Sequence, residues 1–540
     1  MTGHFQRHWP LLLALVLLSV AVAASLKLLL GNTGGRLIYV LDDPYIHMAI
    51  AKNFSQKGIW GVTGSGFTSN SSSLLWTALL SAVYYFTSPN EVTPFVINII
   101  VCTVLVFWLY RLLLKHQLHS VYLFFVLMVI TFVTSFPLLI FAGLEHTLQV
   151  LINFVFVVSA ARFLSEDRKH PADKAIMLVL APVLVLVRYE GLFLVFTVCC
   201  LLLLRRKYRL AFWIFGLALF PLACYGAFSM WKGWFIFPNS VLLKGNISLF
   251  TADYSLREII KKIVQSYYKL ALHPPLLILI LCALGSLYIR LKDKSSLKQY
   301  SAILWIIFLI TALLHMQFAQ VGGFFRYEAY LVALGLYAAV ISLPGTVGQE
   351  LQLLLQRRQY LRIFILAAVI VTAFSPLFLR AVRTFIWIAP AAKNIYEQNY
   401  QMAMFLKKYY EGTTVAVNDI GAINYFADID CLDIFGLGSL EVAGLRLSGG
   451  YNAESLGKLA RTKKARIAVV YEKWLEKLAG IPQDWIKVGN WRILRNMTCG
   501  DETVTFYAIG LAEEKALSAN LREFSSLLPD DVVESGKYIH

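Results

Sequence analysis

Charged residues are scarce in this sequence. They occupy 15% of its 540 positions, whereas soluble domains carry about a quarter. Hydrophobic residues account for 58%, and the mean hydropathy is +0.64. This balance argues against a soluble globular protein and predicts that lipid, rather than water, solvates most of the chain.

Acidic residues are the scarcer of the two charge types. The chain has 32 Asp and Glu against 49 Lys and Arg, a formal net charge of +17. In a soluble protein such an excess would suggest nucleic acid as a partner. Here the basic residues fall mainly between apolar segments. Basic residues in such positions set the membrane topology and contact lipid phosphates. The sequence therefore predicts membrane lipid, and not nucleic acid, as a partner.

Several signature motifs are absent. The chain has no Gly-x-Gly-x-x-Gly turn for a dinucleotide and no ligand spacing typical of zinc. It shows neither a solenoid repeat nor an inverted transporter repeat. Its seven cysteines imply no disulfide framework, and five of them lie in apolar runs as expected core residues. A disulfide stays open only for Cys431 and Cys499, in the polar C-terminal part.

Long apolar runs are abundant. A spanning helix needs about 20 mostly apolar residues, and we expect eleven such helices. The run 74–87 is short, and we interpret it as a juxtamembrane or re-entrant helix, because a crossing there would move the basic clusters of all later loops to the outer side. The N-terminus is then cytoplasmic and the C-terminus outside. The expected spans are 10–31, 93–113, 120–142, 147–163, 174–188, 191–204, 210–229, 273–290, 299–317, 328–343 and 362–379.

The predicted membrane domain covers residues 1–380. It contains a first outer loop over 32–92 and a second over 230–272. The stretch 243–272 is basic and partly amphipathic, so it is either a helix along the membrane surface or a solvated loop.

From about residue 381 the composition changes to that of a small α/β domain, 381–540. Strands are predicted at 414–417, 465–470, 491–494 and 504–508, and a helix at 473–478. The predicted fold class is an α-helical polytopic membrane protein with a small C-terminal extracytoplasmic α/β domain.

The first outer loop presents an acidic pair, Asp42-Asp43, followed by Pro44. Proline suits the first position of a helix, so Asp43 is predicted to cap a helix over 44–56. This leaves Asp42 with no local structural role. His47, one turn after Asp43, is either a site residue or a packing residue.

Further polar residues fall at the outer ends of the predicted spans. Charges at membrane depth are costly and are kept for function or for pairing, so Arg188 and Glu190 are either site residues or a structural pair. The same two readings apply to Arg326 with Glu328. Lys244 suits a phosphate as a point charge. The candidate binding residues are His47, Asn70, Ser71, Glu145, Arg188, Glu190, Asn239, Lys244 and Arg326.

Together these residues predict an outward-facing cavity with carboxylates on one side and basic groups on the other. Such a cavity suits a reaction between a lipid-borne phosphate and a hydroxyl acceptor. Asp42 would accept the hydroxyl proton as general base, and Arg or Lys would stabilise the departing phosphate. A divalent cation, Mg²⁺ or Mn²⁺, held by Asp42 or Asp43 fits the preference of carboxylates, although nothing in the sequence requires one.

The motifs resemble those of the GT-C superfamily of polyprenyl-phosphate-sugar-dependent glycosyltransferases, in particular its bacterial AftB-like branch. This resemblance implies an inverting transferase in the bacterial inner membrane. It would use a polyprenyl-phosphate-linked sugar donor and a glycan, lipid or protein acceptor at the extracytoplasmic face, with an Asp of the first loop, Asp42 or Asp43, as catalytic residue. The matching segments are 42–46, 68–70, 75–77, 143–145, 188–191, 238–240, 419–422 and 432–437. The last two are expected to shape the C-terminal domain.

Two other classes of function fit parts of the sequence. A transporter or flippase of a lipid-linked sugar would use the same cavity without breaking a bond, but it leaves Asp42 and the C-terminal domain unexplained. A scaffold would use its outer domain to bind a partner protein.

Overall fold

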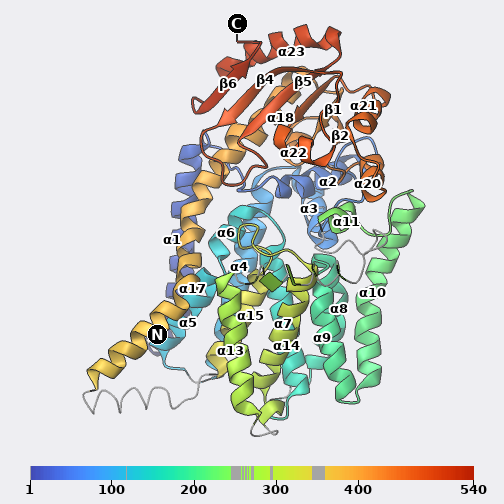
Figure 1. The fold of residues 1–540 in the computed structure, drawn as a ribbon. Coiled ribbons are helices and arrows are strands. Elements are labelled where there is room, and N and C mark those ends of the chain that lie inside the picture. The colour runs from blue at the N-terminus through green and yellow to red at the C-terminus, as the bar shows by residue number, and fades with distance from the viewer. Residues whose placement is uncertain are drawn as a thin grey trace.

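The computed structural model describes residues 2–116, 118–168, 170–244, 273–291, 296–342 and 359–539, with a few positions between 257 and 270. A bundle of apolar helices forms one part of the molecule, and a small mixed sheet with its own helices lies at one end of the bundle (Figure 1). This confirms the predicted fold class, a polytopic α-helical membrane protein with a small C-terminal α/β domain. The predicted surface segment 243–272 lies largely outside the described residues.

Seven helical segments of the described chain are long and apolar enough to cross a membrane. All eleven predicted spans are helical, but several of these helices are shorter than a full crossing, and the number of crossings stays a prediction. The helices that match the predicted spans are α1 (Thr2–Asn32), α4 (Val92–Leu114), α5 (Ser120–Val133) with α6 (Phe136–Ala142), α7 (His146–Leu164), α8 (Asp173–Val187), α9 (Gly191–Leu204), α10 (Tyr208–Trp231), α13 (Pro274–Arg290), α14 (Tyr300–Phe318), α15 (Ala329–Ser342) and α17 (Tyr360–Ile395).

Three short helices lie between the bundle and the C-terminal domain: α2 (Asp43–Lys57), α3 (Leu74–Thr87) and α11 (Asn239–Lys244) (Figure 1). The side chain of Ser73 caps α3 by accepting a hydrogen bond from the backbone N–H of Trp76 at 3.3 Å. The run 74–87 is thus a helix of 14 residues, as expected from its composition.

The C-terminal domain contains one six-stranded sheet with the order β2-β1-β3-β5-β4-β6. Strands β1 (Thr414–Val417), β2 (Asp430–Asp433) and β3 (Ile467–Val470) are parallel, while β4 (Trp485–Ile493), β5 (Thr503–Ile509) and β6 (Val532–Gly536) pair antiparallel. The helices around the sheet are α18 (Gln401–Tyr409), α19 (Ala422–Phe426), α20 (Leu440–Leu447), α21 (Ala453–Thr462), α22 (Glu472–Leu478) and α23 (Leu511–Phe524). The predictions at 414–417, 465–470, 473–478, 491–494 and 504–508 are confirmed, whereas β2 and β6 were not predicted.

Both faces of this sheet are covered. Ile467 and Val469 of β3 belong to the large core shared with the bundle, whereas Ala468 and Val470 belong to a separate core under α21 and α22. This alternation follows from the two-residue period of a strand. Short strands that are buried on both faces read as continuous apolar runs, which is why β1 and β3 were recognisable in the sequence.

The structure bears on the expected domain boundary and on the cysteines. The boundary at residue 381 falls inside α17, which continues through a π-helical turn (Tyr396–Tyr400) into α18. All seven cysteines lie in the described chain and are free, so Cys431 and Cys499 form no disulfide. Cys102 and Cys199 are buried, but Cys224 of α10 is exposed and is therefore not a core residue.

The C-terminal domain docks on the first loop through Asp42. One carboxylate oxygen of Asp42 accepts the backbone N–H of Gly421 and the other accepts that of Ala422, both at 2.8 Å. The predicted roles in the acidic pair are therefore wrong in two respects. Helix α2 begins at Asp43 without any side-chain cap, and Asp42 has a structural role across the domain interface.

Further hydrogen bonds support the same interface. Lys52 of α2 donates to the carbonyl of Tyr425 at 2.7 Å, and the Thr498 hydroxyl donates to the carbonyl of Val40 at 2.8 Å. Asn239 donates its amide N–H to the carbonyl of Gly436 at 2.8 Å. The start of α2 is consequently fixed from the side of the C-terminal domain.

We expect Gly421→Ala to weaken this docking. A Cβ at position 421 would lie 2.2 Å from the carbonyl oxygen of Asp42 and 2.4 Å from its carboxylate, so the loop and the domain must move apart. The expected cost is about 1–3 kcal/mol, measured as a lower Tm and as faster proteolytic release of the C-terminal domain. Gly444→Ala is the control, because its Cβ would meet nothing within 4 Å. Equal behaviour of the two variants would contradict the tight docking.

Candidate functional site

A cavity of about 430 Å³ lies at the end of the bundle that faces the C-terminal domain. One part of its wall is polar and charged, and another part is aromatic and aliphatic. Leu437 brings the C-terminal domain to its rim. The lining residues are Asp43, Ile46, His47, Asn70, Ser72, Leu144, Glu145, His146, Arg188, Tyr189, Glu190, Leu192, Phe193, Phe237, Ser240, Val241, Lys244, Phe318, Ala319, Gln320, Arg326, Tyr327 and Leu437.

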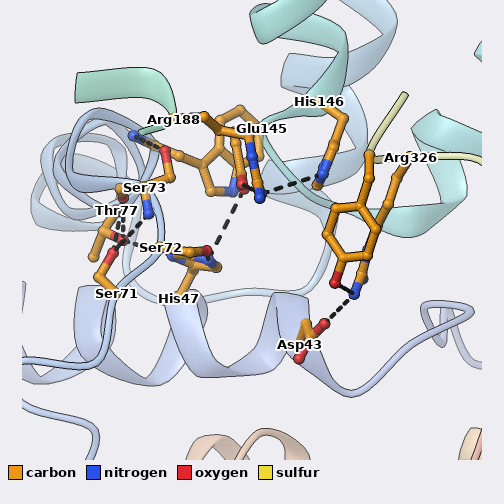
Figure 2. Close-up of polar contacts among 12 residues, drawn as sticks. Asp43, His47, Ser71, Ser72, Ser73, Thr77, Glu145, His146, Arg188 and Arg326 are labelled. Carbon is orange, nitrogen blue, oxygen red and sulfur yellow. Dashed lines mark hydrogen bonds and ion pairs between the residues drawn. The ribbon is translucent and has the colours of Figure 1, made fainter. Parts of the chain in front are cut away.

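Asp43, the first residue of α2, lines this cavity and points toward Arg326 (Figure 2), and Lys244 is its second cationic neighbour. One carboxylate oxygen lies 2.5 Å from a guanidinium nitrogen of Arg326, and the other lies 3.4 Å from Lys244 Nζ. Burial alone would raise the pKa of the Asp43 carboxyl, but Lys244 and Arg326 outweigh burial and hold the pKa well below its usual range. Asp43 is therefore a carboxylate whose basicity depends on these two neighbours.

A second charged group of the cavity centres on Arg188. Its guanidinium binds Glu190 through two hydrogen bonds of 2.7 and 3.0 Å and donates to Glu145 at 2.6 Å. The ring of His146 lies 3.3 Å from the same guanidinium (Figure 2). Arg188 thus holds two carboxylates from different helical connections at one point of the wall.

The backbone between α6 and α7 places Glu145. Gly143 ends α6 in the left-handed region at φ 66°, and a Cβ there would lie 2.5 Å from the ring of Tyr39. Glycine permits both the conformation and the close approach. The chain then turns immediately into α7, so Glu145 faces the cavity instead of lipid.

His47 lies between the two charged groups, one turn along α2 from Asp43. Its Nδ1 is 2.7 Å from the Thr77 hydroxyl, and its Nε2 is 3.4 Å from Ser72 Oγ and 3.9 Å from a Glu145 oxygen (Figure 2). Burial lowers the pKa of His47, and Glu145 opposes this effect only in part. The imidazole is therefore neutral near pH 7 and offers one donor and one acceptor.

Many buried polar atoms of the wall have no hydrogen-bond partner within the described chain. Such atoms are few in native proteins, and a concentration of them marks the place of a ligand or of water. Two of them belong to the buried guanidinium of Arg326, namely Nε and Nη1. The others on the wall are Asn70 Nδ2, Glu145 Oε2, His146 Nδ1, Tyr189 Oη and Ser240 Oγ.

Most of the residues predicted from the sequence meet at this cavity. Those on its wall are Asp43, His47, Asn70, Glu145, Arg188, Glu190, Lys244 and Arg326. Three others do not line it. Asp42 binds the C-terminal domain, the Ser71 hydroxyl donates to the carbonyl of Ser73 at 2.9 Å, and Asn239 joins Ser69 to Gly436 through hydrogen bonds of 2.8 Å.

Other lining residues were not identified from the sequence. His146, Tyr189 and Tyr327 each stand beside a predicted residue, so the neighbouring motif was their signal. Ser72 lines the cavity, whereas the sequence had predicted Ser71 in this position. Gln320 and the aromatic residues of the wall carry no motif, and nothing in the sequence distinguishes them from packing residues.

Asp42 lies in a second acidic environment behind the cavity. Burial and the nearby Asp419 raise the pKa of Asp42 to about 8, against the hydrogen bonds from Ala422 and Gly421. Asp419 accepts hydrogen bonds from Tyr471 at 2.7 Å and from Asn399 at 2.9 Å. Asp42 and Asp419 therefore compete to remain ionised, and both are held by the C-terminal domain.

The two carboxylates of the acidic pair have separate partners in this structure. The Asp43 oxygens face Arg326 and Lys244, while the Asp42 oxygens face backbone N–H groups, so the two carboxylates do not converge on one point. Among the described residues, no group of three or more His, Cys, Asp or Glu is arranged to hold a metal ion.

Comparisons with known proteins give limited matches. Residues 393–507 match a family model described as a domain of unknown function (DUF8728). No curated protein matches the chain in sequence. Among solved structures, the chain is similar to ArnT from Cupriavidus metallidurans in the apo state, with a TM-score of 0.48 and 11% sequence identity over 92% of this chain and 98% of that one.

Removal of the Arg188 charge should destabilise the bundle. Arg188→Gln leaves Glu145 and Glu190 buried without their cation, which costs roughly 3–5 kcal/mol for a broken buried pair. We expect a lower Tm and less monodisperse protein after extraction in detergent. Arg209→Gln is the control, since Arg209 is exposed on α10 and its loss should change the Tm little. An unchanged Tm in Arg188→Gln would show that the ion pairs of Arg188 with Glu145 and Glu190 are not required for the stability of the bundle.

Proposed function

We propose that this protein is a membrane glycosyltransferase of the GT-C type. It moves a sugar from a polyprenyl-phosphate donor to a hydroxyl of a cell-envelope glycan, lipid or protein at the extracytoplasmic face, with inversion at the sugar carbon. One observation carries the proposal: a carboxylate and two cations meet in a cavity that is also lined by aromatic and aliphatic side chains, at the end of an apolar helical bundle. The resemblance of the sequence motifs to this superfamily agrees with it.

The two cations suit the phosphate of the donor. Arg326 has two guanidinium nitrogens without a hydrogen-bond partner in the described chain, and Lys244 is a half-exposed point charge on the same wall. Guanidinium and ammonium groups bind phosphate oxygens through charge-assisted hydrogen bonds, which are stronger than neutral ones. The phosphate therefore takes the position beside Arg326 and Lys244.

The apolar part of the wall suits the lipid chain of the same donor. Phe193, Phe237 and Phe318 line it together with Leu192 and Val241. A soluble sugar nucleotide would gain nothing from this surface, whereas a polyprenyl chain gains about 25 cal/mol for each Å² that it buries. The cavity thus matches a donor with a charged head and a long hydrocarbon tail.

Asp43 is the proposed general base, in place of Asp42. Asp43 lies on the cavity wall, whereas Asp42 faces away into the domain interface. With Arg326 and Lys244 bound to it, Asp43 is too weak a base for a hydroxyl. When the donor phosphate takes these cations, the carboxylate loses their stabilisation, its pKa rises, and it accepts the proton of the acceptor.

The reaction then balances as a single displacement. The acceptor oxygen forms a bond to the anomeric carbon of the sugar, and its proton passes to Asp43. The bond between that carbon and the phosphate oxygen breaks, and its electron pair leaves with the polyprenyl phosphate. Arg326 and Lys244 stabilise the charge that grows on this leaving group.

The base assignment is tested by a pair of variants in reconstituted membranes with a polyprenyl-phosphate-linked sugar. We expect Asp43→Asn to lower transfer by roughly 10²–10⁴-fold, the usual contribution of a general base, and to lower the Tm as well, because the buried Arg326 loses its carboxylate partner. Asp42→Asn should lower the Tm and reduce transfer much less, because an amide oxygen still accepts one backbone N–H. The reverse pattern would assign the base to Asp42.

The same assay separates a transferase from a transporter. A transferase releases free polyprenyl phosphate in proportion to the acceptor that is glycosylated. Movement of intact donor across the bilayer, without release of polyprenyl phosphate, would contradict the proposed reaction and favour a flippase.

Metal removal is a separate test. Because Asp43 is held by Arg326 and Lys244 and does not converge with Asp42, the proposed reaction needs no divalent cation. We expect the transfer rate in EDTA to stay within about twofold of the rate without EDTA, because the side chains of Arg326 and Lys244 stabilise the phosphate charge. Loss of activity in EDTA that Mg²⁺ or Mn²⁺ restores would show that a cation takes part.

A further inference from the structure

A second cavity lies at the opposite end of the helical bundle. It has a volume of about 270 Å³ and is lined by side chains from the end of α4, the end of α7 and the connection that follows it, and the helices α14 and α15. Helix α7 joins the two cavities, because His146 lines the first and Arg162 lines the second. Sixteen residues of α-helix rise roughly 24 Å, close to the thickness of a bilayer core. The second cavity therefore lies near the other membrane surface.

Basic groups dominate this cavity. Its lining includes Lys115, Arg162 and Arg168, against Asp167 as the acidic residue. Arg162 is satisfied by Asp173, which lies 2.7 Å from its guanidinium. The exposed carboxylate of Asp167 accepts the backbone N–H of Tyr300 at 2.8 Å and also acts electrostatically on Arg290. Arg168 and Lys115 are left as the charges that the cavity offers to a ligand.

Arg168 is held in place by neutral partners. Its guanidinium lies over the ring of Tyr300 at 5.2 Å and 3.1 Å from His116 Nε2. Burial and the guanidinium of Arg168 lower the pKa of His116 to about 4, so this imidazole carries no charge near pH 7. Arg168 is thus oriented by an aromatic ring and a neutral imidazole, and no carboxylate of the described chain forms an ion pair with it.

Lys115 follows the last turn of α4 and is exposed. Its side chain has no hydrogen-bond or ion-pair partner among the residues that the structure describes. The cavity thus presents the oriented guanidinium of Arg168 and the ammonium of Lys115. Groups of these two kinds bind phosphate oxygens. Basic pockets between membrane helices at this depth suit the headgroups of acidic lipids.

We propose that this second cavity binds a phosphate-bearing anion through Arg168 and Lys115. Two sources of that chemistry reach the site, an acidic phospholipid of the adjoining leaflet and a soluble phosphate compound. The lipid is favoured by the position of the cavity at the membrane surface. The proposal is independent of the reaction proposed for the first cavity.

The test measures binding of short-chain phosphatidylglycerol to the full-length protein in neutral detergent by native mass spectrometry. Each cation near a phosphate surface contributes about fivefold in affinity, the equivalent of the interaction expected per Lys or Arg. We therefore expect Lys115→Gln to weaken binding about fivefold and Lys115→Gln with Arg168→Gln about 25-fold. Lys115→Gln removes an exposed side chain, so it reports on the site even if the double variant folds poorly.

The matched control is Lys174→Gln with Arg209→Gln. It removes the same charge from exposed positions in the first turns of α8 and α10, at the same end of the bundle but outside the cavity. Its affinity should stay within twofold of the parent. Equal loss in both double variants, or no loss in Lys115→Gln, would overturn the proposal, because the attraction would then belong to the surface as a whole.

Two further measurements identify the source of the phosphate. Phosphatidylcholine should bind at least tenfold more weakly than phosphatidylglycerol if net headgroup charge is recognised. Inorganic phosphate at millimolar concentration should not displace the bound lipid. Displacement that disappears in Lys115→Gln would instead assign the site to a soluble phosphate compound.

Discussion

The carboxylate of Asp42 and the backbone N–H groups of Gly421 and Ala422 join the two halves of this molecule, and the position of the next residue depends on that contact. Asp42 and Asp43 are adjacent, so a hydrogen bond that fixes one of them to the C-terminal domain orients the other toward the bundle. A carboxylate that accepts two backbone N–H groups has little rotational freedom. The α/β domain, which contributes only Leu437 to the cavity rim, therefore acts on the site mainly through the first loop.

The same contact explains where sequence reasoning on the acidic pair failed. The local rule assigns Asp43 as a cap, because it precedes Pro44, and leaves Asp42 free for chemistry. The partners that decide the roles are distant in sequence: Gly421 for Asp42, and Arg326 with Lys244 for Asp43. A local pattern carries no information on such partners, so the sequence pointed to both carboxylates but not to the groups that bind each of them.

Other features were predictable because their signal is local. The apolar runs of the bundle and the strands β1 and β3 follow from composition and periodicity over a few residues. Arg188 and Glu145 were found because buried charges are rare enough in apolar segments to be noticed. Phe193 and Phe318 were not found, since an aromatic residue on a membrane helix looks the same whether it faces lipid, a neighbouring helix or a cavity.

Charge balance in the first cavity has a consequence for the proposed reaction. Among the described residues, the wall holds three carboxylates, Asp43, Glu145 and Glu190, and three cations, Arg188, Lys244 and Arg326, so this set is formally neutral when the imidazoles are neutral. A donor phosphate adds negative charge to this balance. Arg188 is bound by two carboxylates at short distance. Lys244 is 3.4 Å from Asp43, and two nitrogens of Arg326 have no hydrogen-bond partner in the part of the chain that the structure describes, so these two cations can exchange partners most easily.

In the proposed reaction, this exchange links the strength of Asp43 as a base to the presence of the donor. While the cations remain on Asp43, its pKa stays well below the usual range, and the carboxylate accepts no proton from a hydroxyl. Once the phosphate takes them, the same burial that they had outweighed raises that pKa. An acceptor, or water, that enters before the donor thus meets a carboxylate too weak to activate it, and the base becomes effective only when there is a sugar to transfer.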